Sequence, residues 1–268
     1  MTTIFINPKQ DKQINDGAHQ LNHSATITNI ETWQSLLDCY LQIKQEVVPK
    51  RVFLVLDDVH QAEYTSMHTT HNKPLYFDDA PYLGHIYAND QDFEYVYANV
   101  VSLLSVQHYT QQFKQPEHQK TFDDLSKKMR HYNADDLITI IRINENPLPV
   151  MDQEMSVKVA EVESEVLKFA WLPNGYFVSD FDPFENFAII QRMQHYGFEF
   201  IGLGAALLGW IKTPVFKDAT INGLIQDLSL IYHFDLETQN AMKELILKNN
   251  YLILPYTESP QEYLDYYS

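Results

Sequence analysis

Two adjacent aspartates, Asp57 and Asp58, directly follow the apolar run Val52–Leu56 and could hold a magnesium ion. A strand ending in an aspartate is typical of nucleotide-hydrolysing enzymes, but these hold the phosphates on a separate glycine-rich turn ending in Gly-Lys. The chain contains no Gly-Lys pair. We therefore expect no nucleotide-hydrolase activity, and we interpret the two aspartates as the solvated end of a buried strand.

A second possible chemistry is metal binding by Asp57, Asp58, His68 and His71. Carboxylates and imidazoles are ligands for zinc, manganese and iron. The same region contains four more such side chains: His60, Asp78, Asp79 and His85. The strong spacing His-Glu-x-x-His is absent, because His68 and His71 are three residues apart without the catalytic glutamate. A metal-dependent hydrolase is therefore the alternative function, and our first expectation is a protein without metal or other cofactor.

The segment FIGLGAALLG partly matches a dinucleotide-binding fingerprint through Gly202, Gly204 and Gly209. That fingerprint requires G-x-G-x-x-G between a strand and a helix. Here the spacing is longer, and the following residues favour another strand. We predict two strands that meet at a glycine bend. The chain also lacks a G-x-S-x-G nucleophile motif, and its single cysteine, Cys39, lies beside the apolar stripe of a predicted helix. No catalytic residue is predicted.

Aromatic and acidic residues alternate in WLPNGYFVSDFDPFENF, residues 171–187. In a basic protein such rings would suggest stacking on nucleic-acid bases, but here carboxylates take the place of arginines. Tyrosine and tryptophan often anchor protein interfaces, while acids guide the approach of a basic partner. We therefore predict protein-binding contacts at Tyr176, Asp180, Asp182 and Glu185.

The net charge of −17 disfavours binding to nucleic acids and anionic membranes, and favours a basic protein partner. The first residues, MTTIFINPKQDKQ, have neither the basic start nor the long apolar run of a signal peptide. With a single cysteine, no disulfide can form within one chain. These features lead us to expect a cytoplasmic protein.

The order of predicted elements indicates an α+β fold with a mostly antiparallel sheet. Helices are expected at 33–45, 93–113, 182–196, 218–232 and 236–248, and strands at 25–30, 52–56, 157–171, 198–204, 206–212 and 251–256. Residues 60–92 have a loop-like pattern with short strands at 75–77 and 85–87. A polar, proline-containing segment, 145–156, divides the chain into an N-terminal α+β region, 1–148, and a C-terminal α+β region, 149–268. These regions could be two subdomains or one continuous fold.

The residues WLPNGYFVSDFDPFENFAIIQRMQHYGFEFIGLGAALLGWI, 171–211, resemble bacterial domains that accompany polymorphic and contact-delivered toxins as immunity proteins. The likeness lies in the PNGYF turn, the DPFEN helix start and the YGFEFIGLG step from helix to strand. It covers less than a sixth of the chain and includes no catalytic motif. The resemblance implies an acidic cytosolic protein that neutralises a cognate toxin by binding it. We expect this binding to occlude the toxin's active site.

Overall fold

A computed structural model describes residues 2–5, 24–83, 101–128 and 132–262. The protein has an α+β fold with one mixed, mostly antiparallel sheet. Its strands are β1 (Thr2–Phe5), β2 (Ala25–Thr28), β3 (Arg51–Val55), β4 (Met155–Ala160), β5 (Phe198–Leu203), β6 (Leu207–Lys212) and β7 (Tyr251–Pro255). The predicted fold class is therefore confirmed.

The seven strands follow the order β1-β2-β4-β3-β5-β6-β7. Each neighbouring pair is antiparallel except β3 and β5, which run parallel with Leu54 opposite Gly202. β5 and β6 form a hairpin closed at residues 204–206, so the predicted pair of strands at a glycine bend is confirmed. Gly202 is required by close packing, because a Cβ there would lie 1.9 Å from the carbonyl oxygen of Leu54.

The helices mostly begin and end where the local sequence predicts. Thr32 and Asp182 form capping boxes at the starts of the helices that begin at Trp33 and Pro183, and Asp235 caps the helix that begins at Leu236. The α-helices are α1 (Trp33–Glu46), α2 (Val59–Thr70), α3 (Ala80–Leu83), α5 (Ser102–Lys114), α6 (Phe122–Ser126), α7 (Ala134–Glu145), α8 (Pro183–His195), α9 (Ile221–Tyr232) and α10 (Leu236–Lys248). Short 3-10 helices are η3 (Pro116–His118), η4 (Leu148–Val150), η5 (Val166–Trp171) and η6 (Asp218–Thr220).

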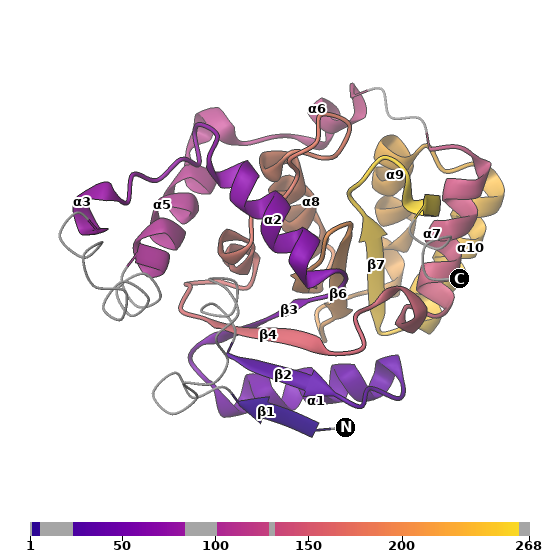
Figure 1. Cartoon of the computed structure of the whole chain (residues 1–268). Coiled ribbons are helices and arrows are strands. Elements are labelled where there is room, and N and C mark those ends of the chain that lie inside the picture. The colour runs from indigo at the N-terminus through magenta and orange to yellow at the C-terminus, as the bar shows by residue number, and fades with distance from the viewer. Residues whose placement is uncertain (1, 6–23, 84–100, 129–131, 263–268) are drawn as a thin grey trace.

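Helices cover both faces of the sheet unequally (Figure 1). α1 packs on one face, where Leu36 and Tyr40 meet Val52 and Leu54. The other face lies beneath α2, α5, η5, α8 and α9, in a larger core that includes Phe53. Successive residues of β3 thus point into different cores, which explains its continuous apolar sequence.

Three sequence predictions are wrong in this architecture. Residues 59–70 form helix α2 rather than loop, and residues 75–77 are not a strand. The expected strand at 157–171 ends at Ala160, and η5 follows it. The helix predicted from residue 93 is described only from Ser102, and the strand at 85–87 lies outside the described residues.

A single sheet joins the two regions predicted from the sequence, 1–148 and 149–268. Strand β4 of the second region lies between β2 and β3 of the first and pairs with both. The segment 145–156 contains η4 and leads directly into β4. Val150 and Met151 in this segment are buried, so it packs as part of the fold.

The outer edge of β7 is closed by a side chain from α7. Asn144 Nδ2 donates to the carbonyl oxygen of Ile253 at 2.7 Å, and Asn144 Oδ1 accepts from the Ile253 amide at 2.9 Å. An unpaired strand edge can template association with another chain. Asn144 satisfies the amide and carbonyl groups of Ile253, with which a further strand could otherwise pair.

A lysine is buried between the sheet and α2. Lys158 of β4 is only 2% exposed, and its ammonium nitrogen lies 3.9 Å from Glu63 Oε1 of α2. Burial lowers the pKa of the Lys158 ammonium to about 8, although Glu63 acts in the opposite direction. The lysine therefore opposes folding while it is protonated.

We predict that the double variant Lys158→Met/Glu63→Gln is more stable than the wild type at pH 7, by about 1–3 kcal/mol. Between pH 8 and the usual lysine pKa of about 10.4, the unfolded chain holds more protons, so wild-type stability rises with pH. The stability difference should therefore narrow from pH 8 to pH 10. Urea denaturation at pH 8 and pH 10 measures the free energies of unfolding of the double variant and the wild type. The control is Lys248→Met, which replaces an exposed lysine. A constant difference would contradict the assignment to Lys158 titration.

Candidate functional site

Asp57 lies buried at the end of β3, where it holds the β5–β6 hairpin. Its Oδ2 atom accepts from the Ala206 amide at 3.0 Å, and its backbone carbonyl accepts from the Ala205 amide at 2.9 Å. Gly204 makes this approach possible, because a Cβ there would meet Asp57 Oδ1 at 1.9 Å. Burial raises the pKa of the Asp57 carboxyl well above its ordinary value. The interpretation of Asp57 as a solvated strand end is therefore wrong.

Asp58 and Asp152 fix the start of α2. Asp58 Oδ1 caps the helix by accepting from the Gln61 amide at 3.0 Å. The two Asp152 carboxylate oxygens accept from the amides of Asp58 and Val59, each at 3.0 Å. A helix N-terminus favours anions. At α2 this position is filled by the protein's own carboxylate.

The predicted metal ligands lie along the whole of α2. Asp57 and Asp58 precede the helix, whereas His68 is in its last turn and His71 forms its C-cap. With a rise of about 1.5 Å per residue, Asp58 and His68 are separated by roughly 15 Å along the helix. The described residues include no group of three His, Cys, Asp or Glu side chains that could hold a metal ion, and His85 lies outside them.

Two of the four predicted partner contacts have side chains that reach solvent: Tyr176 is 41% exposed, and the Asp182 side chain is 40% exposed. Asp182 accepts from the amides of Phe184 and Glu185 and thereby caps α8. Glu185 is buried, accepts from the Asp182 amide and pairs with Lys128 at 2.5 Å. Asp180 is also buried. Because the DPFEN pattern forms a helix cap, Asp182 and Glu185 have structural contacts of their own.

Tyr176 belongs to an exposed group of mostly aromatic side chains. The ring centroids of His68 and Tyr176 are 5.1 Å apart, and His68 lies 4.5 Å from Tyr64. The ring of Phe177 lies 5.3 Å from Tyr176. We call this the α2 aromatic surface and define it as Tyr64, Met67, His68, Tyr176, Phe177 and Val178.

The exposure of this surface is substantial. Tyr64 and Phe177 are each about half exposed, at 51% and 50%, and Val178 is 96% exposed. Single exposed apolar residues are common, but neighbouring ones that contact each other often mark an interaction site. The arrangement can bury aromatic rings against another molecule while their polar groups face the rim.

The turn at 174–176 is fixed to α2 by hydrogen bonds. Asn174 Nδ2 donates to the carbonyl oxygen of Ala62 at 3.0 Å, and Asn186 Nδ2 donates to the Asn174 carbonyl oxygen at 3.0 Å. Gly175 has φ of 119°, and a Cβ there would lie 2.1 Å from the carbonyl oxygen of Phe181. Glycine thus allows the turn to place Tyr176 beside His68.

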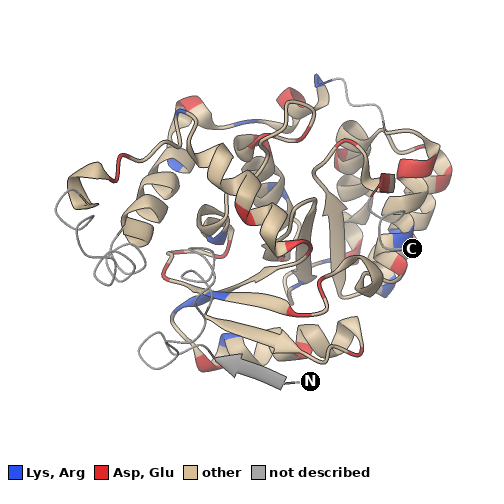
Figure 2. Ribbon diagram, in the orientation of Figure 1, with Lys and Arg blue, Asp and Glu red and all other residues tan. Residues whose placement is uncertain are grey.

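An acidic hollow adjoins the N-terminus of α2. It has a volume of about 430 Å³, and its side chains include Asp58, His60, Asp152 and Glu154. His60 lies one helical turn before Tyr64, so the hollow and the α2 aromatic surface are neighbours along one helix. Figure 2 shows acidic residues where α2 meets the sheet.

The sequence interpretation missed Tyr64 and Met67, and considered His68 only as a metal ligand, because it did not predict α2. The buried face of this helix consists of Ala62, Thr65, Ser66 and Thr69, so no apolar stripe marks it. A helical interpretation of HQAEYTSMH would have placed the missed side chains on one face, since they are three and four residues apart.

No protein-family model matches the chain, and the comparisons found no significant match among curated proteins or solved structures. Within the described parts of the chain, every helix is too short or too polar to cross a membrane.

We predict that Gly175→Ala lowers the free energy of unfolding by about 1–3 kcal/mol, because the new methyl group meets the Phe181 carbonyl and the positive φ is strained. The NMR contact between the His68 and Tyr176 rings should also weaken. Gly223→Ala is a matched control: its Cβ would lie in ordinary contact, 3.4 Å from the Tyr196 hydroxyl. An unchanged ring contact in Gly175→Ala would show that this turn does not position Tyr176.

Proposed function

We propose that this protein binds a basic protein partner through the α2 aromatic surface. The observation that supports this proposal is the contact between Tyr64, His68 and Tyr176, rings that lie together at the surface. The partner class that fits best is a toxin, which this chain would neutralise as an immunity protein by direct binding and occlusion of the toxin's active site.

Two physical properties make this surface a suitable anchor. Tyrosine side chains bury a large area while losing few rotamers, and they dominate many interface energies. Tyr176 is also held in place before binding, because Asn174 and Gly175 fix the turn that carries it. A preorganised ring costs less entropy to bury than a mobile one.

Charge supports a basic partner. The chain has a net charge of −17, and the acidic hollow with Asp58 and Glu154 adjoins the aromatic rings. Opposite charge accelerates encounter and orients the approaching molecule. In this proposal the acids of the hollow take the guiding role first predicted for Asp180, Asp182 and Glu185, which contact their own fold.

The alternative of a metal-dependent hydrolase requires ligands that converge. Asp58 and His71 cap opposite ends of α2, and Asp57 is bound to the β5–β6 hairpin. We therefore do not propose a metal-dependent reaction for this part of the chain.

The direct test uses the product of the gene that adjoins this one, if it is basic and toxic when expressed alone. Co-expression with this protein should restore growth, and the purified pair should bind directly in calorimetry. The variant Tyr64→Ala/Tyr176→Ala should weaken binding about 100-fold or more, since anchor residues contribute about 2 kcal/mol each. Tyr82→Ala, which is also 41% exposed but lies on α3, is the control. Equal binding by the double variant and the wild type would refute the proposed surface.

A second prediction concerns the rate of association. Glu154→Lys should slow association with the basic partner about tenfold at low salt, because it reverses a charge within the acidic hollow. Glu244→Lys makes the same change of net charge on α10 and should have a smaller effect. Stopped-flow measurements at two salt concentrations compare the association rates of the two variants with that of the wild type. Equal slowing would indicate that net charge alone, rather than the hollow, guides association.

A further inference from the structure

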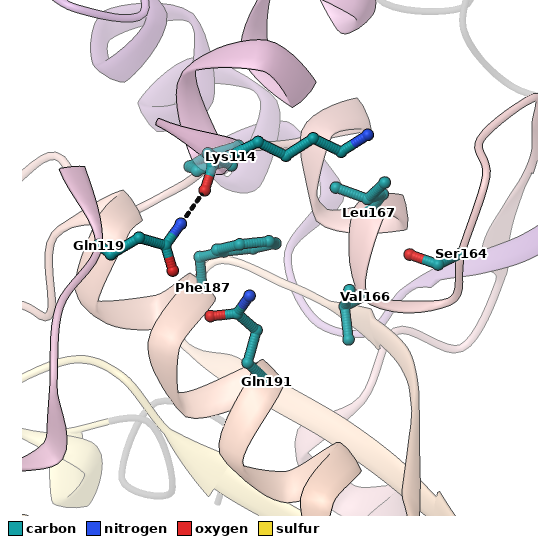
Figure 3. A pocket seen from close by; sticks show the side chains of 8 residues that line it. Lys114, Gln119, Ser164, Val166, Leu167, Phe187 and Gln191 are labelled. Atoms are coloured by element: carbon teal, nitrogen blue, oxygen red, sulfur yellow. Dashed lines mark hydrogen bonds between the residues drawn. The ribbon is translucent and has the colours of Figure 1, made fainter. Parts of the chain in front are cut away.

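The aromatic clusters of this protein differ in the access that another molecule has to their rings. In the hollow between α5, η5 and α8, drawn in Figure 3, Phe187 is only 4% exposed and Phe113 is fully buried, so their rings are closed to a ligand. In the α2 aromatic surface, by contrast, Tyr64 is 51% exposed and Tyr176 is 41% exposed. The faces of these two rings are open to another molecule.

Among the described residues, no lysine or arginine of the protein itself lies over the ring of Tyr64 or Tyr176. The cations that do lie over rings contact other aromatic side chains: Tyr40, Phe122, Tyr196 and Phe216. An aromatic face attracts a cation within about 6 Å of the ring centre. The exposed faces of Tyr64 and Tyr176 are therefore available to a cation of another molecule.

The protein contains its own example of rings and a carboxylate that hold a guanidinium group. Arg192 Cζ lies 5.6 Å from the ring centroid of Phe122 and 5.4 Å from that of Tyr196. Arg192 Nε also donates to Asp227 Oδ2 at 2.6 Å. A planar guanidinium can stack on a ring and pair with a carboxylate at once, whereas a lysine ammonium is a compact and strongly hydrated charge. Rings next to carboxylates therefore favour arginine over lysine.

The acidic hollow supplies carboxylates next to the exposed rings. Its side chains include Asp58, Asp152 and Glu154. Burial raises the pKa of the Asp152 carboxyl and the charge of Asp58 adds to this effect, although backbone hydrogen bonds oppose it. A cation bound in the hollow would relieve the repulsion between these acids. His60 at the hollow and His68 in the aromatic surface are separated by roughly 12 Å along α2.

We infer that the basic partner places an arginine side chain on the rings of Tyr64 and Tyr176, and a second basic side chain at the acidic hollow. This inference rests on the proposed function, because it assigns the chemistry of the partner at the same surface. In an extended segment, residues i and i+4 point to the same side and lie about 13 Å apart, which matches the separation of His60 and His68. An extended segment with two arginines four residues apart therefore fits this face of α2.

The experiment titrates the full chain with two peptides, acetyl-Arg-Thr-Thr-Thr-Arg-amide and acetyl-Lys-Thr-Thr-Thr-Lys-amide, and follows the backbone amides by NMR at pH 8 and low salt. The amides that shift should lie in residues 58–68 and 175–178. We expect the arginine peptide to bind about threefold more tightly, because stacking on the rings adds to the charge attraction that both peptides share. Since the two peptides have equal charge, this ratio measures the contribution of the rings.

Variants separate the ring faces from the bulk of the side chains. Tyr64→Leu/Tyr176→Leu keeps apolar side chains but removes the aromatic faces, so the two peptides should bind this variant equally. Tyr64→Phe/Tyr176→Phe keeps the faces and should retain the threefold preference. Tyr82→Leu replaces an exposed tyrosine of α3 and is the matched control that should change nothing. Glu154→Gln should weaken binding of both peptides about twofold, because it removes a carboxylate of the hollow.

The inference is overturned if the wild type binds the two peptides equally, or if Tyr64→Leu/Tyr176→Leu still prefers arginine. It is also overturned if the amides that shift lie outside α2 and the segment that carries Tyr176. The partner proposal survives these results when Tyr64→Ala/Tyr176→Ala loses affinity for the intact partner. If the peptides bind as expected but that variant binds the intact partner as the wild type does, the partner proposal alone fails.

Discussion

The buried carboxyl group of Asp57 connects three parts of the fold at one point. It accepts from the Ala206 amide, its backbone holds Ala205, and Asp58 starts α2 immediately afterwards. Loss of such a buried acceptor would leave backbone amides without a partner, which is costly in the interior. The position of the β5–β6 hairpin against β3 therefore depends on this residue, and α2 starts directly after it.

Helix α2 is attached mainly by polar contacts. Its buried face is small and weakly apolar, and Asp152, Asn174 and Lys158 contact it from the surrounding structure. Hydrogen bonds are directional, so they fix the position of the helix without a large apolar interface. Its opposite face can therefore display rings to solvent, and this combination makes α2 the centre of the candidate site.

The acids of this protein serve two different purposes. Some stabilise the fold from within: Glu199 accepts from the buried Tyr40 hydroxyl at 2.6 Å, and Lys168 Nζ donates to the same hydroxyl at 3.0 Å. Burial raises the pKa of Tyr40 and lowers that of Lys168, so this cluster joins α1 and η5 through largely desolvated groups. Others, such as Glu154, remain exposed. Net charge alone cannot tell these purposes apart, because both kinds count equally toward −17.

The sequence by itself determined the elements that carry strong local signals. Thr32, Asp182 and Asp235 cap the helices that were expected from residues 33, 182 and 236, and the apolar runs of β3, β5, β6 and β7 lie in the core. The α+β class and the turn at Gly175 follow from such signals, since caps, turns and periodicity act within a few residues. Tyr176 was thereby found as an exposed candidate.

Only the tertiary structure decided the rest. α2 has no apolar stripe, so its helix and the contact of His68 with Tyr176 depend on a sheet and a turn that are distant in sequence. The partners of two acids are also distant in the sequence, so their roles could not be predicted from it. Asp57 binds the hairpin at Ala206, and Glu185 pairs with Lys128. The residue type alone does not show whether a carboxylate caps a helix, is buried or is exposed to solvent. Its partners are fixed only when remote segments pack together and remove water from around it.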